Sequence, residues 1–295
     1  MIKGVLFGFL TYALFSCSDA TAKALGGNLS VFEIGFFLTL ASLSTFGFAR
    51  SKSERWRELF RLNRPRLVFL RAGAGICGGI FSFYAFTTIP FAEAYSVLFL
   101  MPLFATMLSI PVLGEKIGWR RWLAVATGLI GILLVVRPGF QQLHLGHLAA
   151  LLAAFCAAIA ITTLRYIGPT EKRISILAVV YLSAITVNGI LMLHDFEVPT
   201  IAELGLLVFG GVAGGFGQIA LLAAMRLAPA NRVAPAQYSQ IILAIVVGAL
   251  FFGEYPDGVA FAGMALVVCA GLFTFLREEQ LRGWSRRVPL MRNRP

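Results

Sequence analysis

Apolar residues run along this chain in long blocks that are separated by short polar stretches. A helix needs about 20 apolar residues to cross the hydrocarbon core of a bilayer, and ten blocks are near this length. No block shows the strict alternation of a membrane β-strand, so the pattern predicts spanning helices. The ten predicted helices cover residues 2–24, 31–49, 67–88, 91–113, 119–136, 147–165, 174–193, 202–225, 233–252 and 258–276.

Composition supports an all-α integral membrane protein. Of the 295 residues, 58% are hydrophobic and only 13% are charged, whereas soluble proteins have about 25% charged residues. This balance excludes a disordered chain, a collagen and a coiled coil, and it argues against a soluble enzyme.

The net charge of +11 arises from 25 Lys and Arg against 14 Asp and Glu. Ten spans place both termini on one side, and all Lys and Arg except Lys23, Arg71 and Arg137 then fall on that side. By the positive-inside rule both termini are cytoplasmic, and the charge indicates topology rather than nucleic-acid binding. Arg71 lies only about a turn inside its helix, so we expect it to snorkel to the cytoplasmic interface.

The first apolar block resembles a signal peptide at its start, but Asp19 and Lys23 near its end indicate a retained helix. All cysteines lie within apolar blocks without paired spacing, which predicts free thiols and no disulfide or zinc site. They are Cys17, Cys77, Cys156 and Cys269. The three histidines lie in predicted external connections, where we expect them to be solvated. They are His144, His147 and His194.

The chain contains a weak internal duplication. A shift of about 139 residues aligns a Pro-containing turn, an apolar helix and a final Gly-Glu in both halves. The aligned pairs are Pro90 with Pro229, Ala105 with Ala244, Gly114 with Gly253 and Glu115 with Glu254. The expected repeats are residues 1–140 and 141–276, followed by a basic cytoplasmic tail over 277–295. Five helices per half require opposite orientations, which is the inverted repeat typical of secondary transporters.

These motifs resemble the drug/metabolite transporter superfamily, specifically its EamA-type members. The resemblance rests on ten helices in a 5 + 5 arrangement and on Gly-Glu after the fourth helix of each half, and it covers residues 2–276. It implies an exporter of small metabolites in the bacterial inner membrane, with amino acids of the aromatic and neutral type as substrates. It also implies a central cavity lined by helices 1–4 and 6–9, with helices 5 and 10 peripheral.

Ionisable and polar side chains inside a span are candidates for function. In the first helix Tyr12, Ser16, Asp19 and Lys23 lie along one face. Asp19 would bind a substrate ammonium or a proton, or it would neutralise Lys23 four residues later in a structural ion pair. Both alternatives stay open.

The fourth and ninth helices carry polar residues near their starts. Glu93 and Arg232 are equivalent in the two repeats and suit opposite gates, or they are interfacial residues that follow the charge rule. Tyr95 follows Glu93 on the same helix. In the ninth helix Gln237, Tyr238 and Gln240 either line a cavity or form interhelical hydrogen bonds.

Weaker candidates lie on the third and eighth helices. Phe81, Tyr84 and Thr88 share a face that would stack on a substrate, although many of the 26 Phe residues only pack or face lipid. Gln218 ends a glycine-rich run that favours close packing or a hinge.

The sequence therefore predicts a secondary transporter, and we expect no enzyme activity, cofactor or metal. Its partners are a small-molecule substrate and the lipid bilayer; proton coupling and a homodimer are left open. The alternatives are a carrier of a nucleoside-like or vitamin-like metabolite, an integral-membrane lipid-modifying enzyme, and a scaffold or sensor without transport.

Overall fold

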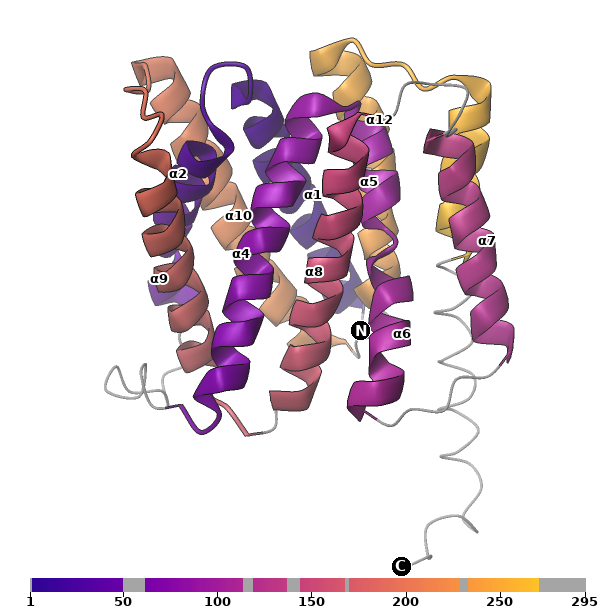
Figure 1. Cartoon of the computed structure of the whole chain (residues 1–295), viewed down its shortest axis with the longest axis horizontal. Coiled ribbons are helices and arrows are strands. Elements are labelled where there is room, and N and C mark those ends of the chain that lie inside the picture. The colour runs from indigo at the N-terminus through magenta and orange to yellow at the C-terminus, as the bar shows by residue number, and fades with distance from the viewer. Residues whose placement is uncertain are drawn as a thin grey trace, which may run out of the picture.

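Long helices run up and down through a computed structural model of the chain, as Figure 1 shows. The structure describes residues 2–49, 62–113, 119–136, 144–167, 170–228 and 233–270, and no strand occurs among them. The helices are α1 (Ile2–Leu25), α2 (Val31–Leu43), α3 (Phe46–Ala49), α4 (Pro65–Thr88), α5 (Phe91–Leu98), α6 (Met101–Leu113), α7 (Trp119–Val136), α8 (Leu145–Ile167), α9 (Arg173–Met192), α10 (Ile201–Leu227), the 3₁₀ helix η2 (Ala234–Tyr238), α12 (Ser239–Phe252) and a last helix over Gly258–Ala270.

Every predicted segment contains helix, so the all-α prediction is confirmed for the described residues. Six helical stretches there are long and apolar enough to cross a membrane, and four further apolar helices are shorter. Two predicted helices are interrupted. The second breaks between α2 and α3, and the fourth breaks at Phe99 and Leu100 between α5 and α6.

The outer surface of the bundle is apolar in the way that a lipid-facing surface requires. Leu148 and Phe155 on α8 and Leu250 and Phe251 on α12 are all exposed. An exposed apolar surface of this extent is unfavourable in water and favourable against lipid tails. The exposed leucines and phenylalanines thus agree with the high hydrophobic content of the chain.

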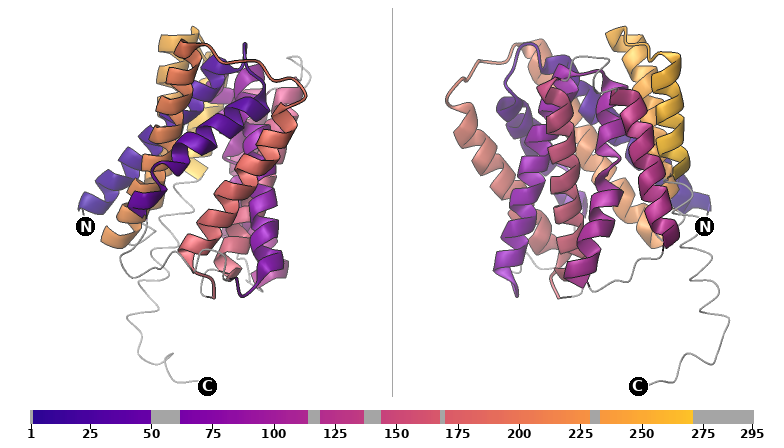
Figure 2. Two further views of the ribbon diagram at one scale, coloured as in Figure 1. Left: turned by 90° about the vertical axis from the view of Figure 1, so that its left-hand side faces the viewer. Right: turned by 45° about the vertical axis from the view of Figure 1, so that its right-hand side comes forward.

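Two long helix pairs form opposite walls of the bundle. The helix α1 packs along α10, and α4 packs along α8. The helix α2 contacts α10 of one wall and also α9, and α9 contacts α4 of the other wall. The helices α2 and α9 therefore join the two walls at one edge. Figure 2 shows that α1 and α10 lean away from α4 and α8 toward the end where the N-terminus lies. We call this end the lower end and the opposite end the upper end, as they stand in Figure 1.

The two walls meet closely at the upper end. A Cβ atom on Gly26 would lie 1.8 Å from Cγ2 of Thr87 at the end of α4, so only glycine permits this approach. The largest hydrophobic cluster also lies around the α4–α5 turn and includes Phe86, Phe91 and Tyr95 together with Ile241 of α12. The upper end is therefore packed shut.

Buried carboxylates fix connections on both ends of the bundle. Ser30 and Glu33 form a capping box at the start of α2, and the fully buried Glu33 also accepts a hydrogen bond of 2.8 Å from the backbone N–H of Glu197. Glu171, before α9, accepts a hydrogen bond from the backbone N–H of Arg64, before α4. Each carboxylate thus holds the loop that precedes a long helix of the other half of the chain.

The helix α7 and the helix over Gly258–Ala270 pack against each other at one edge of the bundle (Figure 1). A Cβ on Gly131 would lie 2.8 Å from the carbonyl oxygen of Gly263, so the two backbones touch.

Some residues named from the sequence lie outside the described residues, namely Gly114, Glu115, Pro229, Arg232 and the tail over 277–295.

Candidate functional site

A chain of hydrogen bonds links three polar side chains inside the bundle. The Tyr95 hydroxyl on α5 donates to Oδ2 of Asp19 on α1 over 2.5 Å. The Gln240 amide on α12 donates to the Tyr95 hydroxyl over 3.4 Å. Because each residue comes from a different helix, the cluster exists only when α1, α5 and α12 converge. We call these three residues the Asp19 cluster.

Aromatic rings pack around the tyrosine of the Asp19 cluster. Tyr95 is 3% exposed, and its ring lies 5.3 Å from that of Phe86 and 5.0 Å from that of Phe91 between centroids. Ser16, one turn below Asp19 on α1, is also buried. Asp19 itself is partly exposed, so a cation or hydrogen-bond donor can reach its carboxylate beside these apolar groups, which strengthen the interaction.

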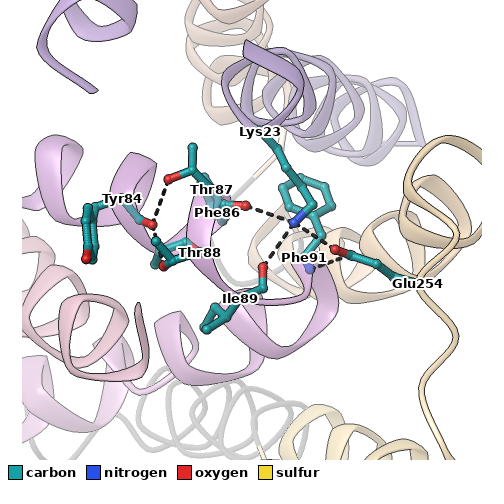
Figure 3. A network of polar contacts seen from close by, with 9 residues as sticks. Lys23, Tyr84, Phe86, Thr87, Thr88, Ile89, Phe91 and Glu254 are labelled. Atoms are coloured by element: carbon teal, nitrogen blue, oxygen red, sulfur yellow. Dashed lines mark hydrogen bonds and ion pairs between the residues drawn. The ribbon is translucent and has the colours of Figure 1, made fainter. Parts of the chain in front are cut away.

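One turn above Asp19, the ammonium group of Lys23 contacts one carboxylate and two backbone carbonyl oxygens (Figure 3). Its ammonium lies 2.8 Å from Oε1 of Glu254, 2.9 Å from the carbonyl oxygen of Phe86 and 3.0 Å from that of Ile89. The other carboxylate oxygen of Glu254 accepts the backbone N–H of Phe91 over 2.7 Å. We call Lys23 and Glu254 the upper clasp, because they join α1, the α4–α5 turn and the segment after α12.

Of the two alternatives for Asp19, the ion pair with Lys23 does not form. Both residues lie on one face of α1, but Lys23 reaches upward to Glu254 while Asp19 bonds to Tyr95. The reason is that the converging helices offer each group a better partner than its helical neighbour. Asp19 therefore has no cationic side chain as a partner among the described residues.

The start of the ninth predicted helix is irregular. Residues Ala234–Tyr238 form a 3₁₀ turn before α12, which the nearby Pro235 favours. Tyr238 is buried, and its ring stacks on Phe99 at the α5–α6 break with 5.1 Å between centroids. Gln237 is partly buried beside it, and Tyr12 is partly buried on α1. Of the polar run, Gln240 is the member that bonds to the Asp19 cluster.

Glu93 lies beside a histidine. Oε2 of Glu93 is 3.4 Å from Nε2 of His147, whose side chain is only 11% exposed. The expectation of a solvated His147 is therefore wrong, because α8 begins against α5 at this end. His144 and His194 are exposed, as expected. Arg232, the predicted counterpart of Glu93, lies outside the described residues, so its gate assignment stays a prediction.

The structure does not bring the α4 candidates into the Asp19 cluster. Phe81 packs against the main hydrophobic cluster, Tyr84 is 36% exposed, and the Thr88 hydroxyl bonds to the Tyr84 carbonyl oxygen of its own helix. Figure 3 places Tyr84 and Thr88 on the far side of the α4 end from Lys23. Gln218 is exposed on α10. The face shared by Phe81, Tyr84 and Thr88 in an ideal helix is thus divided between core and surface.

Two residues that the sequence analysis did not select join the candidates. Glu254 entered that analysis only as part of the repeated Gly-Glu, yet it closes the upper clasp. Arg71 lines a cavity between α4, α6 and α8, and its Nε is buried without a hydrogen-bond partner among the described residues. The expected snorkelling of its side chain to the cytoplasmic interface stays a prediction. Its position as one of three exceptions to the charge pattern was the available signal.

The described residues contain no group of His, Cys, Asp and Glu that would hold a metal ion, and the four cysteines are free thiols. What the arrangement offers instead is a partly buried carboxylate, a buried phenol and a buried amide at the meeting point of helices from both halves of the chain. These groups bind polar ligands by hydrogen bonds and charge.

Comparison with known proteins agrees with these features. The sequence model of the EamA-like transporter family matches residues 2–137 and again residues 144–276. A Rickettsia prowazekii protein named S-adenosylmethionine uptake transporter is 27% identical over 281 residues, which is 95% of this chain and 94% of that protein. The Pseudomonas aeruginosa pseudopaline exporter CntI is 30% identical over 273 residues, 91% of this chain and 94% of its own.

A crystal structure has the same fold. It superposes with a TM-score of 0.65 at 20% identity and covers 95% of this chain and 99% of its own. Together with the apolar helices and the family match over nearly all of the sequence, these relatives settle the class of the protein. The chain belongs to the EamA-like transporter family and is a multi-pass membrane transporter of small metabolites.

Proposed function

We propose that this protein is a secondary transporter that exports amino acids, chiefly of the aromatic and neutral type, across the bacterial inner membrane by alternating access. The Asp19 cluster carries the proposal, because its carboxylate lies partly buried between the two halves of the chain and has no cationic partner among the described residues. The ammonium group of an amino acid is a cation of the size that such a carboxylate binds.

An inverted repeat over 1–140 and 141–276 is part of this proposal. The family model matches once in each half. The first helix of each half packs along the third helix of the other, since α1 packs on α10 and α8 packs on α4. Phe99 and Tyr238, which the 139-residue shift makes equivalent, stack on each other. Both observations are what a two-fold axis in the membrane plane would produce.

The buried carboxylates support the same symmetry. Glu33 holds the loop before α10, and Glu171 holds the loop before α4. These loops lie at opposite ends of the bundle, so the two contacts correspond when one half is inverted onto the other. Opposite orientation of the halves would place ten spans in the membrane with both termini in the cytoplasm.

The upper clasp supports alternating access. With cytoplasmic termini, the upper end faces outward and is closed by Lys23 and Glu254, whereas α1 and α10 diverge from α4 and α8 toward the cytoplasm (Figure 2). Export would require the clasp to open while the lower end closes. The bound ammonium would remain on Asp19 during this exchange.

Reconstituted liposomes provide the test. We expect the purified protein to release preloaded radiolabelled phenylalanine, and we expect Asp19→Asn to slow release about tenfold or more, because a charge-assisted hydrogen bond contributes about 1.5–3 kcal/mol. Asp195→Asn is the matched control, since Asp195 is exposed in the α9–α10 connection. Equal release by wild type and Asp19→Asn would reject the site, and no release of any amino acid would reject the substrate class.

The names of the relatives favour a second candidate, a carrier of another class of metabolite. One relative is named for uptake and another for export, and neither is named for an amino acid alone. A thermal-shift screen of the purified protein with nucleosides and vitamins beside amino acids separates the two. Stabilisation only by a nucleoside or vitamin would select this candidate.

A further inference from the structure

A cavity of about 360 Å³ lies between α4, α6 and α8. This volume is within the range of about 300–1,000 Å³ that small-ligand sites have. Its lining runs along one face of α4 from Arg71 to Ser82 and along the facing stripe of α8 from Ala153 to Leu164, with Met101 of α6. Arg71 and Ser82 are eleven positions apart, which corresponds to about 16 Å of helix, so the cavity is elongated.

Glycine and alanine keep this space open. A Cβ atom added to Gly75 or to Gly79 would meet no other atom within 4 Å, so a larger side chain would occupy the cavity itself. Gly78 between them packs instead on Cys156 and Ala153 of α8. The wall thus combines close helix packing with free space beside the exposed faces of Gly75 and Gly79.

Among the described residues that line the cavity, Arg71 alone is charged. Its Nε is buried without a hydrogen-bond partner, and no described carboxylate lies within ion-pair distance of its guanidinium. Lys23, by contrast, has a carboxylate and two carbonyl oxygens. A cation in the span of a membrane protein is costly and normally faces a partner, a water-filled cavity or a substrate.

We propose that Arg71 binds a carboxylate group of the substrate in the cavity between α4, α6 and α8. A guanidinium presents parallel N–H donors that match the two oxygens of a carboxylate, which an ammonium does not. This inference rests on the proposed transport function and deepens it, because Arg71 would bind the carboxylate of an entering substrate before its ammonium group reaches Asp19.

The position of Arg71 agrees with this role. It is the seventh residue of α4, so it lies about 9 Å above the lower end, where the two walls diverge. Asp19 lies near the upper end, one turn below the contact of Lys23 with the end of α4. A substrate that enters from the lower end would meet Arg71 first and the Asp19 cluster deeper in the bundle.

The experiment compares acids with their amides. Thermal stabilisation of purified wild-type protein is measured with phenylalanine and phenylalanine amide, and with nicotinate and nicotinamide. We expect stabilisation by at least one acid and at least tenfold weaker binding of its amide. Arg71→Gln should remove this preference, lowering affinity for the acid about tenfold while leaving the amide within about twofold. Arg71→Lys should restore it in part.

Arg66→Gln is the control, since Arg66 is exposed in the first turn of α4, and it should leave the preference unchanged. Acids and amides that bind wild type equally, or an acid preference that survives in Arg71→Gln, would overturn the inference. The inference would also be overturned if none of the acids stabilised the wild-type protein. Stabilisation by nicotinate but by no amino acid would retain Arg71 as the anion site and reject the amino-acid function, so the two failures are distinguishable.

Discussion

The upper clasp and the Arg71 cavity each contain a cationic side chain inside the bundle, and they differ in the partners that this side chain has. Lys23 has an ion pair of 2.8 Å and two backbone carbonyl acceptors, and its side chain is 9% exposed. Arg71 lies beside open space, and its Nε has no partner among the described residues. A cation with a complete set of partners stabilises one arrangement of helices, whereas one without partners is available to a ligand.

The largest expected effect breaks the clasp. Lys23→Met leaves the carboxylate of Glu254 without its cation, and we expect the free energy of unfolding to fall by about 3–5 kcal/mol. Denaturant unfolding in detergent, followed by circular dichroism, measures this change. Lys3→Met, at an exposed position of α1, should change stability by less than about 0.5 kcal/mol.

A second substitution sharpens the interpretation of the clasp. Adding Glu254→Gln to Lys23→Met removes the unpaired charge but keeps an oxygen that accepts the Phe91 N–H, so most of the lost stability should return. If the double variant is as unstable as Lys23→Met alone, the ion pair is not the source of the stabilisation.

An intermediate effect is expected at Tyr95, between the two regions. Tyr95→Phe removes the hydroxyl that joins Asp19 to Gln240, and we expect transport in liposomes to fall about tenfold with a stability loss of about 1–2 kcal/mol. Tyr84→Phe is the matched control on α4, because the Tyr84 side chain is exposed and has no described hydrogen bond to the Asp19 cluster. A larger loss of transport in Tyr84→Phe than in Tyr95→Phe would place the substrate elsewhere.

The smallest effect is expected on α10. Gln218→Leu replaces an exposed amide at a position without a described hydrogen bond, so transport should stay within about twofold and stability within about 0.5 kcal/mol. The same transport assay and unfolding measurement apply. A strong loss of transport would show that Gln218 contacts the substrate in another conformation of the protein.

Several features of the fold were predictable because they depend on local sequence. The Ser30–Glu33 box begins α2 where polar residues give way to an apolar block, and Pro65 lies in the first turn of α4. The break at Phe99 and Leu100 was not predicted, although Pro102 lacks the N–H that would bond to the carbonyl oxygen of Leu98. Only the structure places the ring of Phe99 on that of Tyr238.

The candidate site was predictable in part. Polarity within an apolar span selected Asp19, Tyr95 and Gln240, and these three meet. The same criterion also selected Tyr84 and Gln218, which are exposed. Helical spacing left open an ion pair of Lys23 with Asp19, whereas Lys23 pairs with Glu254. Helical spacing gives the face of a side chain on an isolated helix, but not which neighbour that face meets.

By itself, the sequence determined where the helices lie, that the chain belongs in a membrane, and which polar residues are unusual there, because hydrophobic length and helix ends are properties of neighbouring residues. Only the tertiary structure decided that Asp19 bonds to a tyrosine 76 residues away, that Glu254 holds Lys23, and that Arg71 faces a cavity. These outcomes depend on how helices rotate and tilt against one another, and that is set by packing among all of them.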